Sequence, residues 1–258
     1  MSNDDGRELY EMNPLGRFTE RAEDYRRHRP DYPAAAYDAM LTGLGDPTLL
    51  TAADVGAGTG ISARQLAQRG VFVIAVEPNP AMRGAAEPHP RVEWRAGSAE
   101  STGLPGASVR LVLCAQSFHW FRPNETLREF HRILVPDGRL ALMWNVRNSD
   151  DPVTREYTRI IREVSRDHPA EMRAFDSQAL PESEWFSKPQ LERFDHWQML
   201  DRQGLLGRAT SSSYVPRDPD SMSFLRTELG ALWEERRDAR GMVKMGYRTD
   251  LFLAEPVR

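Results

Sequence analysis

The chain of 258 residues contains little cysteine and little lysine. Its single cysteine, Cys114, excludes a disulfide framework and a cysteine-based zinc cluster, so a hydrophobic core must hold the fold together. No pair among the six histidines has metal-ligand spacing, and we therefore expect no metal. Neither lysine, Lys188 or Lys244, follows a tyrosine by four positions. This absence excludes the Tyr-x-x-x-Lys pair that one large group of nicotinamide oxidoreductases uses.

The sequence also lacks a long apolar run and a surplus of basic charge. The longest clean apolar run, Val71–Val76, is far too short to cross a bilayer, and the first residues are polar and acidic, unlike a secretory signal. We therefore expect a cytoplasmic protein with no membrane partner. The net charge of −4 disfavours a nucleic-acid partner, because dedicated nucleic-acid binders normally carry a concentrated basic excess.

Strand and helix patterns alternate between residues 49 and 145. We predict strands at residues 49–55, 71–76, 92–95, 109–115 and 139–145. The strand at Val71–Val76 is apolar on both faces, as a strand covered by helices on each side must be. Such alternation predicts an α/β fold of three layers, in which a Rossmann-like, doubly wound, mainly parallel sheet lies between helices. Side chains that can cap the intervening and following helices are Asn79, Asn124, Asp151 and Asp218.

The remaining segments are predicted to surround this core. Residues 1–48 form an N-terminal helical cap segment in this interpretation, and residues 49–258 form the core domain. Prolines between aromatic residues predict an insertion or lid at about 166–190, and a helical region follows at about 204–238. A strand at 191–200 and an alternating, half-buried antiparallel edge strand at 243–253 complete a sheet of seven strands.

A glycine-rich loop joins the first predicted strand to the next helix. Gly56-x-Gly58-x-Gly60 stands where backbone must approach a ligand closely and where helix N–H groups point outward. Glu77 follows the second strand directly, in the position from which a carboxylate accepts hydrogen bonds from a ribose diol in dinucleotide folds. The loop and the acid together predict a nucleoside site. The third glycine comes one residue too early for the pyrophosphate-binding G-x-G-x-x-G fingerprint.

Several motifs extend this pattern. Val55–Gly60 resembles the first motif of the class I S-adenosylmethionine-dependent methyltransferases, and Glu77–Met82 resembles the acid and helix start after that family's second strand. Gly97–Glu100 and Val112–Phe121 are similar to the family's adenine-framing loop and to its fourth strand with the loop that follows. Phe18–Tyr25, Arg29–Pro33 and Ser117–Phe121 resemble the small-molecule subgroup related to trans-aconitate methyltransferase.

This resemblance implies S-adenosylmethionine as the cofactor and a small-molecule methyl acceptor as the partner. It further implies that Tyr25 and Arg29 close over the cofactor, with the guanidinium of Arg29 on the methionine carboxylate. Gln116 and Ser117 follow the fourth strand, where ligands gather in open α/β sheets. The expected cofactor-binding residues are Tyr25, Arg29, Gly56, Ala57, Gly58, Gly60, Glu77, Pro78, Met82, Ser98, Ala99, Glu100, Gln116 and Ser117.

Methyl transfer from a sulfonium requires orientation and a water-poor cavity more than a catalytic triad. A base is needed only if the acceptor must lose a proton, and a carboxylate acceptor needs none. His119 is the candidate catalytic residue, and it either orients the acceptor, acts as a base or simply packs in its loop. We expect His119, Trp120 and Trp144 to line the substrate pocket.

Two alternatives remain beside a methyltransferase that favours oxygen, with carbon and nitrogen acceptors open. One is a nicotinamide-dependent oxidoreductase of Rossmann type, against which the glycine spacing argues. The other is a non-catalytic module that binds S-adenosylmethionine and acts through partners. A nucleic-acid methyltransferase is disfavoured, because the chain lacks both an Asn-Pro-Pro-Tyr base-flipping motif and a basic surplus.

Overall fold

The computed structural model describes residue 10, residues 19–168 and residues 183–257. Its centre is a mixed sheet of seven strands in the order β3-β2-β1-β4-β5-β7-β6. Strands β1 to β5 are parallel to one another, and β7 is antiparallel to both β5 and β6. The strands are β1 (Thr51–Val55), β2 (Phe72–Val76), β3 (Val92–Arg95), β4 (Val109–Ala115), β5 (Leu134–Arg147), β6 (Gln190–Leu200) and β7 (Val243–Ala254). The predicted fold class is confirmed.

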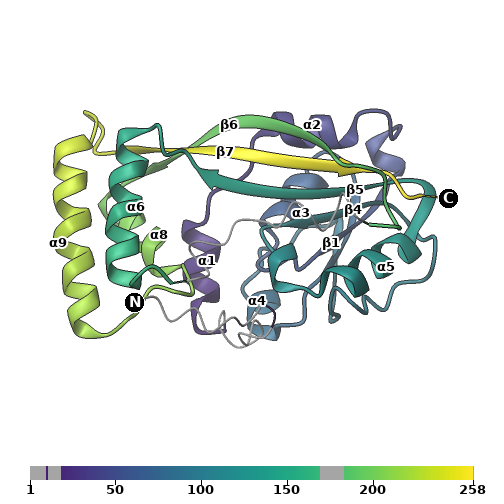
Figure 1. The fold of residues 1–258 in the computed structure, drawn as a ribbon, viewed down its shortest axis with the longest axis horizontal. Coiled ribbons are helices and arrows are strands. Elements are labelled where there is room, and N and C mark those ends of the chain that lie inside the picture. Colours follow the sequence, from purple (N-terminus) through teal and green to yellow (C-terminus); the bar gives the residue numbers. More distant parts are fainter. Residues whose placement is uncertain (1–9, 11–18, 169–182, 258) are drawn as a thin grey trace.

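Helices cover both faces of the parallel part of the sheet (Figure 1). Alternate residues of one strand point to opposite faces, so Leu111 and Leu113 of β4 join one buried cluster, whereas Val112 and Cys114 join the other. The first cluster packs against α2 (Ala34–Leu41) and α3 (Ile61–Ala67), and the second packs against α5 (Pro123–Ile133). This double coverage explains why the strands read as continuous apolar runs.

A third apolar cluster lies beyond the parallel strands, where β5, β7 and β6 extend toward α6, α8 and α9 (Figure 1). These helices are α6 (Pro152–Ser165), α8 (Arg202–Thr210) and α9 (Pro219–Arg236). Their apolar stripes bury Ile160 of α6 and Leu225 of α9 against Tyr247 of β7. The predicted alternation along β7 is confirmed, because Val243, Met245, Tyr247, Thr249 and Leu251 are all buried.

The N-terminal part of the chain reaches from this extension to the parallel sheet, with α1 beside α8 and α2 on one face of the sheet. It contains η2 (Thr19–Arg21), α1 (Ala22–His28), α2 and η3 (Pro47–Leu49). Arg21 donates hydrogen bonds to the carbonyl groups of Thr210, Ser212 and Val215, so α1 is held beside α8. The carbonyl of His28 accepts a hydrogen bond from Gln198 of β6 (2.9 Å). These bonds place the last turn of α1 at the edge of the site described below.

The helix starts are largely as predicted. Asn79 caps α4 (Pro80–Gly84) by accepting from the Ala81 amide at 2.9 Å, and Asp151 and Asp218 cap α6 and α9 in the same way. The prediction that Asn124 caps a helix is wrong. Helix α5 begins at Pro123, because proline fits the first helical position with its fixed φ, and the N-cap Arg122 makes no side-chain cap bond.

Two further details differ from the predictions. Strand β5 begins at Leu134, before residues 136–138, because Leu134 pairs with Val109 and a register shift follows between Val109 and Leu111. Strand β7 lies second from the rim, so β6 forms the edge of the sheet. The predicted lid at 166–190 lies mostly outside the described residues. Its described end packs Trp185 and Phe186 beside the second cluster and not over the site.

Candidate functional site

The glycine loop turns tightly at the carboxyl end of β1. Gly56, Gly58 and Gly60 have φ of +69°, +59° and +78°, a region that residues with a Cβ rarely adopt. The amides of Gly56 and Ala57 both donate to the carbonyl of Val76 at the end of β2, at 2.9 and 3.2 Å. A Cβ on Gly60 would lie 2.7 Å from the ring of Trp94. The absence of a side chain at Gly60 therefore lets the start of α3 pack closely against β3.

Glu77 closes the loop from the side of β2. Its side chain is buried, and each carboxylate oxygen accepts one backbone N–H: Oε2 from Gly58 at 3.0 Å and Oε1 from Asn79 at 2.9 Å. Burial raises the pKa of Glu77 above its ordinary value, and the two amides oppose that shift. A carboxylate has about four acceptor positions, so both oxygens retain capacity for further donors.

These groups line one cavity of about 310 Å³ at the carboxyl ends of β1, β2 and β4. Its lining comprises Tyr10, Tyr25, Gly56, Gly58, Glu77, Pro78, Asn79, Met82, Ser98, Ala99, Glu100, Ala115, Gln116, Ser117, Trp120, Phe121 and Arg122. A second hollow of about 30 Å³ shares five of these residues and continues toward Arg29, Asn145 and Arg208. The two hollows therefore form one cleft.

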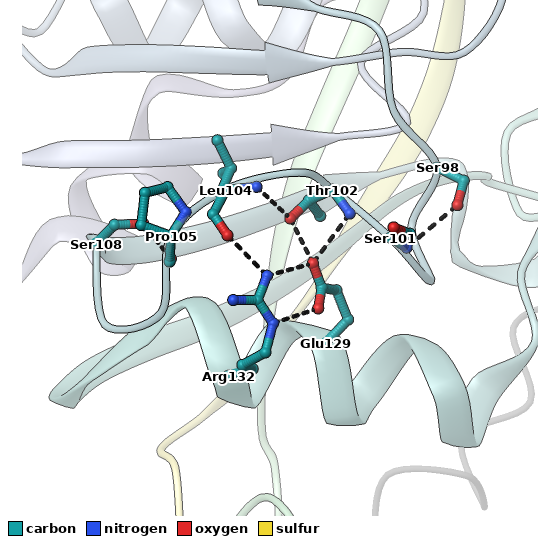
Figure 2. A network of polar contacts seen from close by, with 8 residues as sticks. All are labelled: Ser98, Ser101, Thr102, Leu104, Pro105, Ser108, Glu129 and Arg132. Atoms are coloured by element: carbon teal, nitrogen blue, oxygen red, sulfur yellow. Dashed lines mark hydrogen bonds and ion pairs between the residues drawn. The ribbon is translucent and has the colours of Figure 1, made fainter.

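One wall of the cleft is the loop of residues 98–105, which a polar network ties to α5 (Figure 2). Glu129 accepts from the amide of Thr102 at 2.9 Å and from its hydroxyl at 2.5 Å. Arg132 donates to both oxygens of Glu129 and to the carbonyl of Leu104. The donors and acceptors of this network are paired with one another. The network therefore fixes the loop, including Ala99, against α5.

The opposite wall follows β4. Gln116 has a φ of +58°, an uncommon conformation for a residue other than glycine, and its side chain donates to the carbonyl of Asn145 at 3.0 Å. Ser117 donates to the carbonyl of Val55 at 3.1 Å, which joins this loop to β1. Cys114 lies behind Ser117, and burial raises the pKa of its thiol to about 12. Cys114 is therefore an inert core residue.

Comparison with known proteins agrees with this geometry. Residues 53–142 match the family model described as a methyltransferase domain. A Mycobacterium tuberculosis protein described as an uncharacterized methyltransferase is 35% identical over 196 residues, which is 76% of this chain and 76% of that protein. An uncharacterized methyltransferase-like protein of Schizosaccharomyces pombe is 36% identical over 165 residues, 63% of this chain and 64% of that one. The chain belongs to the methyltransferase family.

Solved structures show the same fold for this methyltransferase. A putative type II methyltransferase of Anaeromyxobacter dehalogenans superposes with a TM-score of 0.66 at 24% identity, over 88% of this chain and 97% of that one. A putative methyltransferase from Anabaena variabilis gives a TM-score of 0.60, also at 24% identity, over 87% and 98% of the two chains. Membership of the methyltransferase family identifies the protein as an enzyme. No helix among the described residues has the length and apolar character needed to cross a membrane.

The structure brings most of the predicted cofactor residues of the methyltransferase into the cleft. Tyr25, Gly56, Gly58, Glu77, Pro78, Met82, Ser98, Ala99, Glu100, Gln116 and Ser117 line the larger hollow, and Arg29 and Ala57 line the smaller one. Gly60, the last glycine of the loop, lines neither hollow and packs against Trp94. Their contacts with the cofactor stay a prediction.

The three residues predicted to line a substrate pocket lie differently. Trp120 lines the larger hollow, whereas His119 and Trp144 line neither. Trp144 is buried in the second apolar cluster, and its indole N–H donates to Nδ1 of His119 at 3.4 Å. Burial and the nearby positive charge of Arg29 lower the pKa of His119 to about 4, so its imidazole is neutral at physiological pH.

Two charged residues near the cleft were missed from the sequence. Asp54 is the last residue but one of β1 and is fully buried, and its Oδ2 accepts from the hydroxyl of Ser62 at 2.6 Å. A carboxylate inside an apolar strand, just before a glycine loop, was a signal that could have found it. Arg208 comes from α8, far from the glycine loop in the sequence, and only the tertiary fold brings it close to the loop.

Burial raises the pKa of Asp54 to about 7, and the bond from Ser62 offsets only part of that shift. The native protein therefore binds a proton between about pH 4 and pH 7 that the unfolded chain has released, so wild-type stability falls as pH rises through this window. Asp54→Asn removes this dependence. We expect the free energy of unfolding of the variant minus that of wild type to be about 2–4 kcal/mol larger at pH 8 than at pH 4.

Urea denaturation at several pH values measures this difference. Asp150→Asn, at an exposed position near the start of α6, is the matched control and should follow the wild-type curve. Parallel stability curves for Asp54→Asn and wild type would show that Asp54 has an ordinary pKa.

Proposed function

We propose that this methyltransferase transfers the methyl group of S-adenosylmethionine to a small-molecule acceptor, with oxygen favoured and carbon or nitrogen acceptors open. One observation carries the proposal. The glycine loop, the buried carboxylate of Glu77 and the strained Gln116 converge on one cleft at the carboxyl ends of neighbouring parallel strands, where open α/β sheets bind ligands. The small-molecule subgroup resemblance supports the choice of acceptor.

The residues present fit a bound nucleoside. Glu77 retains acceptor capacity for sugar hydroxyls, and Gly58 leaves room because its Cβ would lie 3.3 Å from the terminal methyl of Met82. Ala99 and Met82 provide apolar surface for a base beside the loop of residues 98–105. We assign these residues to the adenosine part, and Tyr25 and Arg29 to the methionine part. The cofactor supplies an activated methyl group and a neutral thioether as leaving group.

The described residues of the cleft provide orientation and enclosure instead of a strong base. His119 has a pKa of about 4, and its Nδ1 accepts from Trp144, so it can remove a proton only weakly. A carboxylate acceptor requires no such step. Its oxygen already carries the electron pair that would accept the methyl group, so no residue of the cleft would have to remove a proton. A cleft with only a weak base therefore favours a carboxylate among oxygen acceptors.

The N-terminal segment contributes to enclosure. Tyr25 of α1 lines both hollows, and the guanidinium of Arg29 lies over its ring, 4.7 Å from the centroid. We assign the predicted segment 1–48, of which residue 10 and residues 19–48 are described, the role of a cap over the cofactor. Holding donor and acceptor in attack geometry in such an enclosed cleft can supply about 7–11 kcal/mol of the barrier.

Turnover on a panel of small molecules tests the proposed function. The panel pairs carboxylic acids with their amides, and it adds phenols, amines and activated carbon acids. Release of S-adenosylhomocysteine and the mass of the product are measured together. We expect methyl esters from one or more acids and no product from the matching amides. Cofactor binding without turnover on any member would identify a non-catalytic binding module instead, and binding of NADH in place of S-adenosylmethionine would identify an oxidoreductase.

A further inference from the structure

Two guanidinium groups meet in the smaller hollow without an acidic partner. Arg29, which follows α1, and Arg208 of α8 both line it. Among the described residues, most arginines near an acid form ion pairs, for example Arg217 with Asp24 at 2.6 Å, but neither Arg29 nor Arg208 does so. A buried charge is normally paired, so two such groups side by side are costly unless a ligand supplies the opposite charge.

Neutral groups hold Arg208 in a fixed position. Its Nε donates to the hydroxyl of Tyr247 at 3.1 Å, and Nη1 donates to Ser212 at 3.4 Å. The hydroxyl of Tyr247 in turn donates to Gln198 at 3.5 Å, and Gln198 donates to the carbonyl of His28 at 2.9 Å. The side chain of Arg208 is 5% exposed. This chain of bonds from β7, β6 and α1 fixes the guanidinium but does not neutralise it.

Arg29 is equally short of partners. Its Nη2 makes one long bond to the carbonyl of Ser211 at 3.4 Å, and its Nε is buried without a hydrogen-bond partner. Burial lowers the pKa of Arg29, and the positive charge of Arg208 lowers it further. An unsatisfied N–H and repulsion between like charges are the features expected of a site built for an anion.

The smaller hollow adjoins the larger one, which we assign to the cofactor. Its wall includes Gly56, Gly58 and Gln116, which also line the larger hollow, and Asn145 at the end of β5. A group held by Arg208 would therefore lie beside the glycine loop. Guanidinium groups bind carboxylates in a planar, bidentate manner, which gives direction as well as affinity.

We propose that Arg29 and Arg208 form a carboxylate-binding site, and that Arg208 is the residue by which the enzyme selects an anionic methyl acceptor. This inference rests on the proposed function and adds the substrate class to it. A carboxylate in this place has two sources, the methionine part of the cofactor and the acceptor. Arg29 suits the first, since it lies over Tyr25. Arg208, whose Nε is held by the hydroxyl of Tyr247, suits the carboxylate of the acceptor.

The test uses the full-length wild type, Arg208→Met and a control. Arg217→Met is the matched control, because Arg217 has an acidic partner and is more exposed. Calorimetry first measures binding of S-adenosylhomocysteine to each protein. The complexes are then titrated with acetate, succinate and tricarballylate, and with succinamide as the uncharged counterpart of succinate. Thermal unfolding of each unliganded protein is measured in parallel.

We expect wild type to bind one or more of the carboxylates but not succinamide. Arg208→Met should weaken carboxylate binding at least about tenfold, while its affinity for S-adenosylhomocysteine stays within about twofold and its unliganded Tm does not fall. Arg208→Lys, which keeps the charge but loses the planar fork, should recover part of the affinity. Arg217→Met should bind both ligands as wild type does.

Three results would overturn the inference. If no carboxylate binds wild type, or if Arg208→Met binds carboxylates equally well, the proposed carboxylate-binding site does not exist. A loss confined to S-adenosylhomocysteine would assign the carboxylate to the cofactor instead of the acceptor. A lower Tm with an equal loss of both ligands would make Arg208 a structural residue. If wild type does not bind S-adenosylhomocysteine at all, the proposed function itself fails, and that outcome is distinct from the other three.

Discussion

Glu77→Gln is expected to weaken binding of S-adenosylhomocysteine by about 10- to 100-fold, which corresponds to about 1–3 kcal/mol. Glu77 is a buried carboxylate in the cavity wall, and only its ionised form accepts from every donor around it. Glutamine has nearly the same shape but turns an N–H₂ group toward the amide of Gly58 or Asn79, both of which now donate to the carboxylate. The substitution also removes the negative charge, and with it any charge-assisted hydrogen bonds from Glu77 to a ligand.

Calorimetry on Glu77→Gln and on the control Glu87→Gln measures this effect. Glu87 forms exposed ion pairs with Arg26 and Arg64, so its replacement should leave the affinity unchanged. Thermal unfolding of both variants shows whether the loop remains folded. A folded Glu77→Gln protein with wild-type affinity would mean that the cofactor's sugar is bound elsewhere.

Gly56→Ala should lower the free energy of unfolding by about 2–4 kcal/mol and abolish measurable turnover. The new Cβ would lie 2.6 Å from both Oγ of Ser117 and Cζ of Phe121, at a φ of +69° that also disfavours alanine. Ser117 cannot simply move away, because its hydroxyl bonds to the carbonyl of Val55. The clash would therefore push the loop after β4 away from the glycine loop.

Gly45→Ala separates backbone strain from this close approach. Gly45 has a φ of +100°, but its Cβ would meet no atom within 4 Å. Its replacement should cost about 1 kcal/mol and leave activity intact. Urea denaturation and turnover of the two variants give the comparison. Equal losses of stability at the two positions would show that Gly56 makes no close contact with Ser117 or Phe121.

Much of this site could be predicted because its signals are local. Gly56, Gly58 and Glu77 lie at the ends of strands whose apolar runs are visible in the sequence, and parallel strands bring their carboxyl ends to one edge. The caps Asp151 and Asp218 were also recognisable, since a helix start depends on a few neighbouring residues.

Other features of the site depend on how distant segments pack together. Trp144 was expected to line the substrate pocket, but its side chain points to the face of the sheet that α5 covers. The alternation of side chains along β5 decides this, because Trp144 shares a face with Leu140 and Leu142, which belong to the same buried cluster. Arg208 had no local signal, because its meaning depends on Arg29 and Tyr247, which other elements bring beside it.

A crystal structure of the protein with S-adenosylhomocysteine tests the central claim most directly. We predict density for the ligand across the carboxyl ends of β1 and β2, with its ribose hydroxyls within hydrogen-bond distance of Glu77 and its base beside the loop of residues 98–105. A ligand found in another part of the molecule, or hydroxyls that contact only water while Glu77 keeps solely its bonds to Gly58 and Asn79, would contradict the account.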